Sequence, residues 1–320
     1  MEIIYRERKS AVLSPSRLRC LQDSPTINLT CGCAMGCTYC YIQGYIGYPG
    51  SDRIILYSNL ADKLRQELAR RRQKPRWVYF SPSSDAFQYP RAVRDLAFEV
   101  MQILLENGIG IAFLTKGFVN RRFLALFAAQ PEKIHAQVGL ITVDRGLSRV
   151  FEPRAASALA RIRLLERLAA IGVPVEARLD PMIPGLTDTP PALHRLFDVL
   201  SSAGVRTVAV GYLFLRPRIL QAIARRTSDP QIVSHIQQIG QSFEQVELAG
   251  AKTHARIPPA QLRSDSLERI FEIARQYGVQ VHPCGCKIPE FASCRCNING
   301  QRESGKTACD SSRESLFPAL

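Results

Sequence analysis

Three cysteines, Cys33, Cys37 and Cys40, stand on one short stretch of the chain, with three and then two residues between them. Thiolates at this spacing can ligate three irons of one [4Fe–4S] cube, which leaves the fourth iron without a protein ligand. An open iron is a place where a cofactor or substrate binds, so the spacing indicates chemistry as well as structure. A zinc site is the alternative, because Cys31 could supply the fourth ligand that zinc prefers.

A second group of cysteines lies near the end of the chain, within thirteen residues: Cys284, Cys286, Cys294 and Cys296. Four thiols this close together in sequence can hold a zinc ion or an auxiliary Fe–S cluster, and His282 could also ligate. Two other readings are a reduced group that binds no metal, and a thiol such as Cys296 that donates a hydrogen atom to a radical. Cys20 and Cys309 are expected to be incidental.

Cysteine content and composition indicate where the chain works. Ten cysteines without an apolar signal core at the charged N-terminus favour metal ligation or redox chemistry over disulfides. The sequence has no uncharged apolar stretch of about 18 residues, so no membrane partner is expected. We therefore expect a cytoplasmic protein, in a reducing compartment that suits an oxygen-sensitive cluster.

The formal net charge is +14, and arginine far outnumbers lysine. Arginine binds phosphate in a bidentate manner and stacks on bases, so the excess is compatible with a nucleic-acid or other phosphate-bearing substrate. A solvated basic surface is the alternative, because the basic residues form no single block. Arg154, Arg178 and Arg216 fall at or just beyond predicted strand ends, where each could bind substrate or serve as a structural ion-pair partner.

The elements that must position these residues alternate between apolar strand-like runs and amphipathic helical patterns, which is typical of parallel β/α units. The pattern predicts strands at about 25–30, 77–80, 111–114, 136–142, 175–179 and 207–213. It predicts helices at about 59–72, 91–107, 119–129, 156–171 and 190–203. Six such units make an incomplete (β/α)6 barrel.

The unusual polar residues collect after these strands, as expected for an active site at the carboxyl ends of a barrel. The cysteine loop follows the first strand, residues 81–85 follow the second, and Lys116 ends the third. Residues 142–144 and 180–185 follow the fourth and fifth strands. Polar residues that only formed turns would be found equally at both ends of the barrel, so their collection at one end favours an active site there.

The expected organisation is an N-terminal segment over 1–24, the partial barrel over 25–230, a cysteine-rich C-terminal extension over 231–300 and a flexible tail over 301–320. A helix near 264–277 and a short apolar run at 279–281 precede the second cysteine group. The last twenty residues are rich in Ser, Arg and Lys, which favours disorder.

The cysteine loop, residues 28–41, resembles that of the radical S-adenosylmethionine (SAM) superfamily, and within it the spore photoproduct lyase-like proteins often labelled DNA repair photolyases. Further stretches match landmarks of that subfamily in the same order: residues 81–85, 114–116, 151–155 and 181–188. The resemblance covers about 25–215. It implies a [4Fe–4S] cluster, SAM as cofactor and an electron donor such as flavodoxin or ferredoxin.

Carried over residue by residue, the resemblance implies that Cys33, Cys37 and Cys40 ligate the cluster and that Tyr39 packs near the adenine of SAM. Ser84 and Lys116 fall where the lyase has a serine and a lysine that contact SAM. A cation at a strand end suits the SAM carboxylate. The alternative is that Lys116 is an ordinary surface lysine at a turn.

Two departures bear on the reaction. Spore photoproduct lyase has a hydrogen-donating cysteine where this chain has Pro82, and the family's usual serine on the fourth strand is replaced by Gly139. Cys31, on the cluster loop, or Cys296 could donate the hydrogen atom instead. The sequence therefore predicts a radical SAM enzyme that does not repair spore photoproduct.

The predicted reaction is reductive cleavage of SAM to a 5′-deoxyadenosyl radical, which abstracts hydrogen from a nucleic acid, a nucleotide-type metabolite or a peptide. The alternative function is a non-catalytic, zinc- or Fe–S-dependent nucleic-acid-binding protein.

Overall fold

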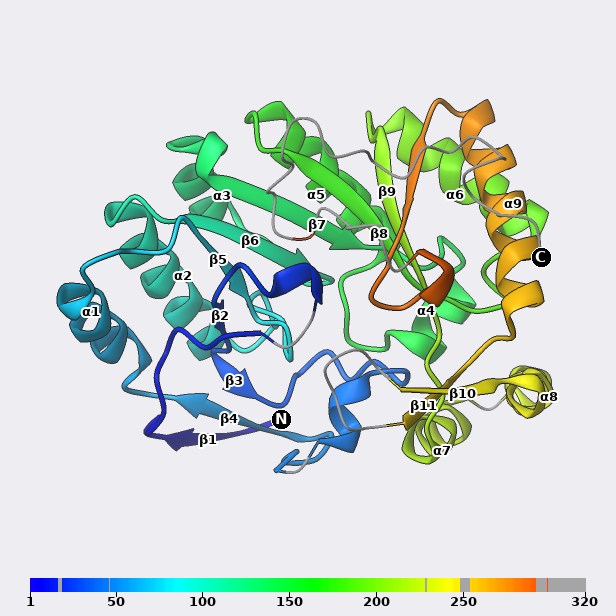
Figure 1. Ribbon diagram of the computed structural model, residues 1–320, viewed down its shortest axis with the longest axis horizontal. Helices are drawn as coiled ribbons and strands as arrows, with labels where there is room; N and C mark the ends of the chain where they lie inside the picture. The colour runs from blue at the N-terminus through cyan, green and yellow to red at the C-terminus, as the bar shows by residue number, and fades with distance from the viewer. Residues whose placement is uncertain (17–18, 46, 228, 248–253, 292–297, 299–320) are drawn as a thin grey trace.

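The computed structural model describes the chain except residues 17–18, 46, 228, 248–253, 292–297 and 299–320. A parallel seven-stranded sheet forms its centre, wrapped by helices (Figure 1). The strands follow the order β12 (Gln280–Pro283), β9 (Thr207–Tyr212), β8 (Val175–Met182), β7 (Ile134–Gly139), β6 (Gly110–Thr115), β5 (Trp77–Phe80) and β2 (Thr26–Ile27). Every pair of neighbours in this order is parallel, so all seven carboxyl ends lie at one edge.

The outer face of this sheet carries the main hydrophobic core. It packs against α1 (Leu60–Arg70), α2 (Arg91–Glu106), α3 (Arg121–Ala128), α5 (Ala158–Ala170), α6 (Pro190–Ser202) and α9 (Ala260–Gln276). Phe113 on β6 stacks on Phe127 of α3 at 5.6 Å between ring centroids, and both are fully buried. The strands alternate because successive side chains point to opposite faces, so every second residue joins this core.

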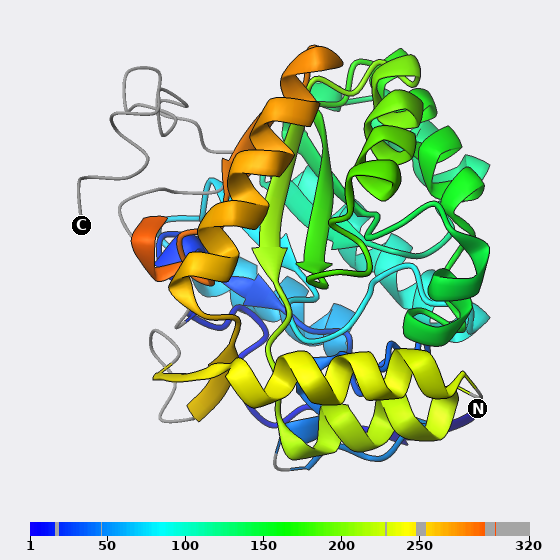
Figure 2. The same cartoon turned by 90° about the vertical axis from the view of Figure 1, so that its right-hand side faces the viewer.

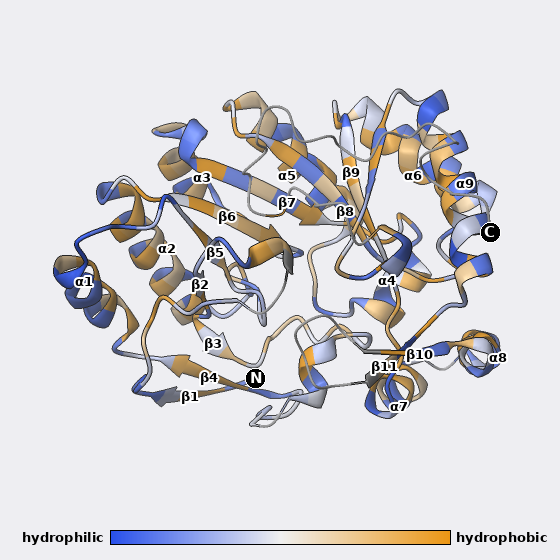
Figure 3. Cartoon of the chain, in the orientation of Figure 1, coloured by the Kyte–Doolittle hydropathy of each residue, from blue (hydrophilic) through white to orange (hydrophobic). Residues whose placement is uncertain are grey.

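The inner face of the sheet is polar where it crosses β7 and β8. Apolar and polar residues alternate along both strands (Figure 3). The outward residues belong to the main core, and the alternate positions hold buried polar side chains: His135, Gln137, Glu176, Arg178 and Asp180. Because Gln137 and Glu176 are directly paired across β7 and β8, their hydrogen bond lies within the sheet's concave side.

Smaller elements close the carboxyl edge of the sheet. A second sheet has the order β1 (Glu2–Arg6), β4 (Arg53–Tyr57) and β3 (Thr30–Cys31), and β10 (Glu244–Glu247) pairs with β11 (His254–Ile257). Helices α7 (Pro217–Arg226) and α8 (Pro230–Ser242) lie side by side beneath the main sheet (Figure 2). The remaining elements are α4 (Arg145–Phe151) and the 3₁₀ turns Arg19–Leu21, Tyr41–Gly44, Pro131–Lys133 and Pro289–Phe291.

Local sequence explains where several helices begin. The side chain of Asp144 accepts a hydrogen bond from Leu147 N at 2.8 Å, and Ser157 Oγ accepts from Ala160 N at 3.2 Å. These are N-cap interactions, which satisfy backbone donors that a helix leaves free at its first turn. They fix the residues at which α4 and α5 begin.

The predicted α/β partial barrel is confirmed, and each predicted strand has a counterpart. The sheet has one strand more than the six expected, because β12 pairs with β9 although it lies in the expected C-terminal extension. Strands β1, β4, β10 and β11 were not predicted. Among the described residues, no helix combines the length and apolar character needed to cross a bilayer. The expected tail over 301–320 lies outside the described residues.

Candidate active site

The cysteine loop runs from the end of β3 to the turn Tyr41–Gly44 and is held by contacts with three other parts of the chain. Ala34 N donates to Gln88 Oε1 at 2.6 Å, and Thr38 N donates to Phe151 O at 3.0 Å. Gly36 has a φ of +63°, and a Cβ there would lie 2.5 Å from Arg154 Nη2. The positive φ favours glycine, and any side chain there would also displace the guanidinium group of Arg154.

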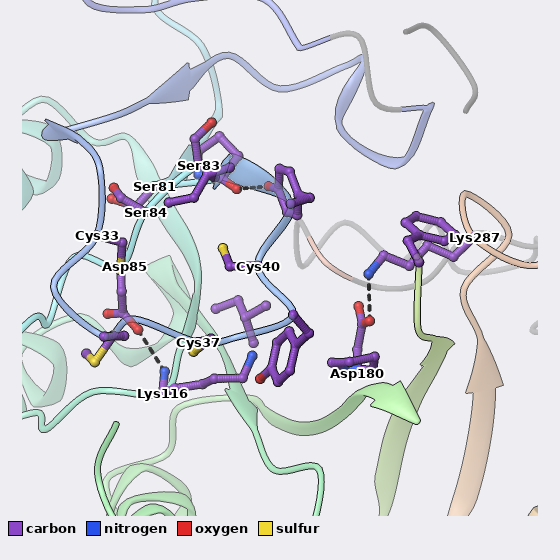
Figure 4. Close-up of a pocket in the computed structure, with 18 of the residues that line it drawn as sticks. Cys33, Cys37, Cys40, Ser81, Ser83, Ser84, Asp85, Lys116, Asp180 and Lys287 are labelled. Atoms are coloured by element: carbon purple, nitrogen blue, oxygen red, sulfur yellow. Dashed lines mark hydrogen bonds and ion pairs between the residues drawn. The ribbon is translucent and has the colours of Figure 1, made fainter. Parts of the chain in front are cut away.

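The loop turns its three cysteines into one cavity (Figure 4). The cavity lies at the carboxyl ends of the strands. The predicted site residues that line it are Cys33, Tyr39, Cys37, Cys40, Ser84 and Lys116. Cys31 is not among the lining residues, and its Sγ donates to Gly47 O at 3.4 Å. The structure thus brings together the three-cysteine set and leaves the fourth cysteine of the loop apart.

The three thiols are desolvated. Burial raises the pKa of Cys33 and Cys40, and it raises the pKa of Cys37 to about 12, from an ordinary value of 9.0. Lys116 partly opposes the effect of burial on the pKa of Cys37 and of Cys40. Such thiols are poor nucleophiles without a metal but become thiolates when a cationic centre binds them. Among the described residues, no group of three or more His, Cys, Asp or Glu side chains has an arrangement that could hold a single metal ion.

The segment after β5 presents hydroxyl groups to the cavity. Ser81 has a φ of +53°, a conformation that side chains other than glycine rarely adopt. The Oγ atoms of Ser81 and Ser84 are both buried, and neither has a hydrogen-bond partner among the described protein atoms. Asp85 anchors the segment, since its carboxylate accepts from Thr115 Oγ1 at 2.9 Å and from Lys116 N at 2.8 Å. Buried hydroxyls without a partner at the wall of a cavity suit a polar ligand.

Lys116 extends along the cavity wall from the end of β6. Its Nζ lies 5.7 Å from the centre of the Tyr39 ring, a cation–π contact. A Cβ on Gly139 would lie 2.9 Å from Lys116 Nζ. The glycine on the fourth strand, which departs from the family pattern, therefore gives the lysine its room.

An ion pair forms the wall on the other side of the cavity from Ser81–Asp85 (Figure 4). Lys287 Nζ donates to Asp180 Oδ1 at 2.6 Å and lies 5.1 Å from the centre of the Phe214 ring. Although burial opposes it, Lys287 and Arg178 lower the pKa of Asp180. A Cβ on Gly211 would lie 3.1 Å from Asp180 Cγ and 3.0 Å from Lys287 Cδ, so the glycine leaves space for the pair.

Sequence reasoning missed Lys287, because its place in the site depends on β12 joining the barrel sheet. The available signal was the helix and apolar run before it, which repeat the β/α pattern of the preceding units. Asp180 was noted only as part of the expected rim.

Part of the second cysteine group is described. Cys284 is buried and accepts a hydrogen bond from Arg178 Nη2 at 3.3 Å, and Cys286 interacts with Cys284 through their side chains. Cys20 N donates to Cys286 Sγ at 3.3 Å, and their thiols also interact. Cys20, expected to be incidental, thus contacts Cys286, which in turn contacts Cys284. Cys294, Cys296 and Cys309 lie outside the described residues.

Comparison with known proteins places the chain. The model of the radical SAM superfamily matches residues 27–197, which is more than half of the chain. The chain belongs to this superfamily. Membership implies a [4Fe–4S] cluster and SAM, and enzymes of the superfamily need a reductant.

Two curated relatives, both uncharacterised, come from Mycobacterium tuberculosis and Mycobacterium bovis. Each is 30% identical over 217 residues, which cover 65% of this chain and 64% of the relative. The match thus spans slightly less than two thirds of the relatives' own length. An uncharacterised protein of Acidianus two-tailed virus is 21% identical over 179 residues, 51% of this chain and 58% of that protein.

Two solved structures show the shared fold. A spore photoproduct lyase mutant with bound AdoMet and dinucleoside spore photoproduct superposes with a TM-score of 0.67, at 15% identity over 87% of this chain and 81% of that one. A radical SAM methyltransferase from Sphaerobacter thermophilus superposes with a TM-score of 0.52, at 18% identity over 82% and 66% of the two chains. The predicted superfamily and fold are confirmed.

The raised pKa of Cys37 predicts how the metal-free protein responds to pH. An acid whose pKa is raised by folding stabilises the folded state below its unfolded pKa, and that stability is lost as pH rises toward the folded pKa. The free energy of unfolding should fall between pH 9 and about 12, by about 1.4 kcal/mol per pH unit for this thiol. Denaturant unfolding at several pH values should show a shallower fall in Cys37→Ser; equal slopes would contradict the assigned shift.

Proposed function

We propose that this enzyme holds its [4Fe–4S] cluster on Cys33, Cys37 and Cys40 and cleaves SAM reductively in the adjoining cavity. The observation that carries the proposal is the convergence of three thiols, from one loop, on one cavity that Cys31 does not line. Three thiolates leave one iron of a cube open. When both groups are bound, this chemistry supplies a 5′-deoxyadenosyl radical that abstracts hydrogen from a substrate.

The walls of the cavity suggest how SAM is held. Lys116 offers an ammonium group beside Cys37 and Cys40, which suits the carboxylate of SAM. Tyr39 offers a partly buried aromatic face, which suits the adenine. Ser84 offers a hydroxyl that has no described protein partner. These roles follow the resemblance to the lyase-like proteins, and the shared location of the three residues supports them.

The substrate lies, in this proposal, between SAM and the wall formed by Asp180, Lys287 and Phe214. Lys287 influences the pKa of Cys40, so its charge acts across the cavity. Arg178 and Arg154 are engaged by Asp180 and by Ser51 O, which favours structural roles for them. The phosphate-bearing substrate class, whether nucleic acid or nucleotide-type metabolite, therefore depends on Lys287 and on the net positive charge; a peptide is the other candidate.

The alternative function, a non-catalytic metal-dependent nucleic-acid-binding protein, predicts colourless protein with stoichiometric zinc. The proposed enzyme predicts brown protein with the broad visible absorption of an Fe–S cluster when purified without oxygen. A reducing, cytoplasmic setting and a flavodoxin or ferredoxin as electron donor complete the proposal. The described cysteines are all free, which is compatible with that setting.

We also propose a second metal centre at the C-terminal cysteines, Cys284, Cys286, Cys294 and Cys296. The contacts between the Cys284 and Cys286 thiols support it, and the contact with Cys20 adds a further candidate ligand. The site would lie behind the Asp180–Lys287 wall, because Arg178 hydrogen-bonds to both Asp180 and Cys284.

Replacing Cys33, Cys37 or Cys40 by alanine is expected to abolish reductive SAM cleavage, because two thiolates do not hold a cube securely. The product, 5′-deoxyadenosine, is quantified by chromatography after anaerobic reduction with dithionite. Cys31→Ala, on the same loop but outside the cavity lining, is the matched control and should cleave SAM like the wild type. A wild-type yield from any of the three variants rules out the assigned ligand set.

Spore photoproduct should not be repaired. Pro82 lines the cavity where the lyase has its hydrogen-donating cysteine, and the proline ring cannot replace a thiol donor. The reduced enzyme is incubated with SAM and a spore-photoproduct dinucleotide, and thymidylyl-thymidine is measured. Catalytic reversion at a rate comparable to SAM cleavage would overturn this prediction and direct attention to another donor, such as Cys31 or Cys296.

Metal analysis tests the second centre. A Cys33/Cys37/Cys40 triple alanine variant is expected to retain iron or zinc, and further loss should follow from Cys284→Ala with Cys286→Ala. Adding Cys20→Ala to the triple variant asks whether the N-terminal thiol contributes. If the triple variant contains neither metal after anaerobic reconstitution, the second centre does not exist.

A further inference from the structure

A buried carboxylate, Glu152, lies directly behind the cluster loop without lining the cavity. It follows the last residue of α4, and its side chain is fully buried. Its Oε2 pairs with Arg161 Nη2 of α5 at 2.6 Å, and that arginine is also fully buried. The other oxygen, Oε1, accepts a hydrogen bond from Tyr39 OH.

The arginine carries the connection on to the sheet. Arg161 Nη1 donates to Gly139 O at 2.7 Å, at the end of β7. One carboxylate and one guanidinium thus join the cluster loop, helices α4 and α5 and the fourth barrel strand. Two charges withdrawn from water are costly unless they are paired. Here the two charges pair with each other, Oε1 accepts from Tyr39 and Nη1 donates to Gly139, whereas Oε2 and Nη2 meet as an ion pair without hydrogen-bond geometry.

The charge of Glu152 also reaches the cavity. Although burial opposes it, Arg161 and Lys116 lower the pKa of Glu152, so the group is a carboxylate. Lys116 lies over the ring of Tyr39, whose hydroxyl is bound to this same carboxylate. The lysine is therefore attracted toward Tyr39 by the ring and by the charge behind it, in the space that Gly139 leaves open.

We propose that Glu152 is a positioning residue for SAM binding, which acts by orienting Tyr39 through a hydrogen bond and Lys116 through its charge. The proposal rests on the proposed function, because it assumes that SAM binds against these two side chains. A merely structural role for Glu152 would affect stability and cluster content and leave the affinity for SAM in cluster-loaded protein unchanged.

The test compares Glu152→Gln, Tyr39→Phe and the double variant with the wild type. Anaerobically reconstituted proteins of equal iron content are titrated with SAM, and the Kd is measured by equilibrium dialysis and by the change in the electron paramagnetic resonance spectrum of the reduced cluster. Each single variant should raise the Kd about tenfold. Tyr39→Phe removes the hydrogen bond, and Glu152→Gln keeps an acceptor oxygen but removes the charge that strengthens this bond and attracts Lys116. The double variant should be no weaker than the weaker single variant, since both changes remove one shared interaction.

A second measurement needs no cofactor. In metal-free protein, alkylation of Cys37 by iodoacetamide, mapped by mass spectrometry, should be faster in both single variants because the loop has lost its anchor. Glu166→Gln, on the exposed side of the same helix α5, is the matched control and should change neither measurement.

An unchanged Kd in both single variants, or effects that simply multiply in the double variant, would overturn the proposal. If Glu152→Gln cannot be loaded with iron, Tyr39→Phe, which removes one hydroxyl only, decides the question by the same criterion. Wild-type protein that binds no SAM would instead refute the proposed function, so the two failures are distinguishable.

Discussion

The buried pair of Glu152 and Arg161 is the interaction on which the arrangement of the site depends. Each charge is fully enclosed, so each is tolerable only because of the other and of the hydrogen bonds that Tyr39 and Gly139 contribute. Removing one partner of such a pair typically costs about 3–5 kcal/mol, because the other is left buried and unpaired. The pair is thus a fixed point between α4 and α5, and the cysteine loop is attached to it through the Tyr39 hydroxyl before any metal is bound.

Buried charges are also paired on the far side of the cavity, along the polar concave face of the sheet. The side chain of Arg178 on β8 crosses β9 and hydrogen-bonds to Cys284, the residue after β12. It can cross because its partner on β9 is the small residue Ala209. Asp180 reaches Lys287 past Gly211 in the same way. Small residues on β9 thus let charged residues bridge two strands that are not neighbours, and the cavity acquires a rigid, charged wall.

Much of the fold was accessible from the sequence, because strands in a parallel sheet and the helices between them have distinct hydrophobic periods. The convergence of Cys33, Cys37 and Cys40 on one cavity could be expected for a different reason, since their close spacing in sequence limits what they can bind. The contacts of Lys287 and Cys20 were not accessible, because they depend on which distant segments the chain folds together. Cys20 meets Cys286 across more than 260 residues, and no local pattern encodes that meeting. Strand β4 was not predicted, although residues 54–56 form an apolar run in the sequence.

The two departures from the lyase pattern gain meaning from their surroundings. Gly139 is not simply a lost serine, because the space of the missing side chain is occupied by Lys116, and its carbonyl is held by Arg161. Pro82 is not simply a lost thiol, because its carbonyl accepts a hydrogen bond from Tyr41 OH at the edge of the cluster loop. Each position makes a contact that holds a neighbouring residue: Gly139 holds Arg161, and Pro82 holds Tyr41. A shared fold with spore photoproduct lyase is therefore compatible with a different reaction, because a fold does not by itself determine the chemistry of the site it carries.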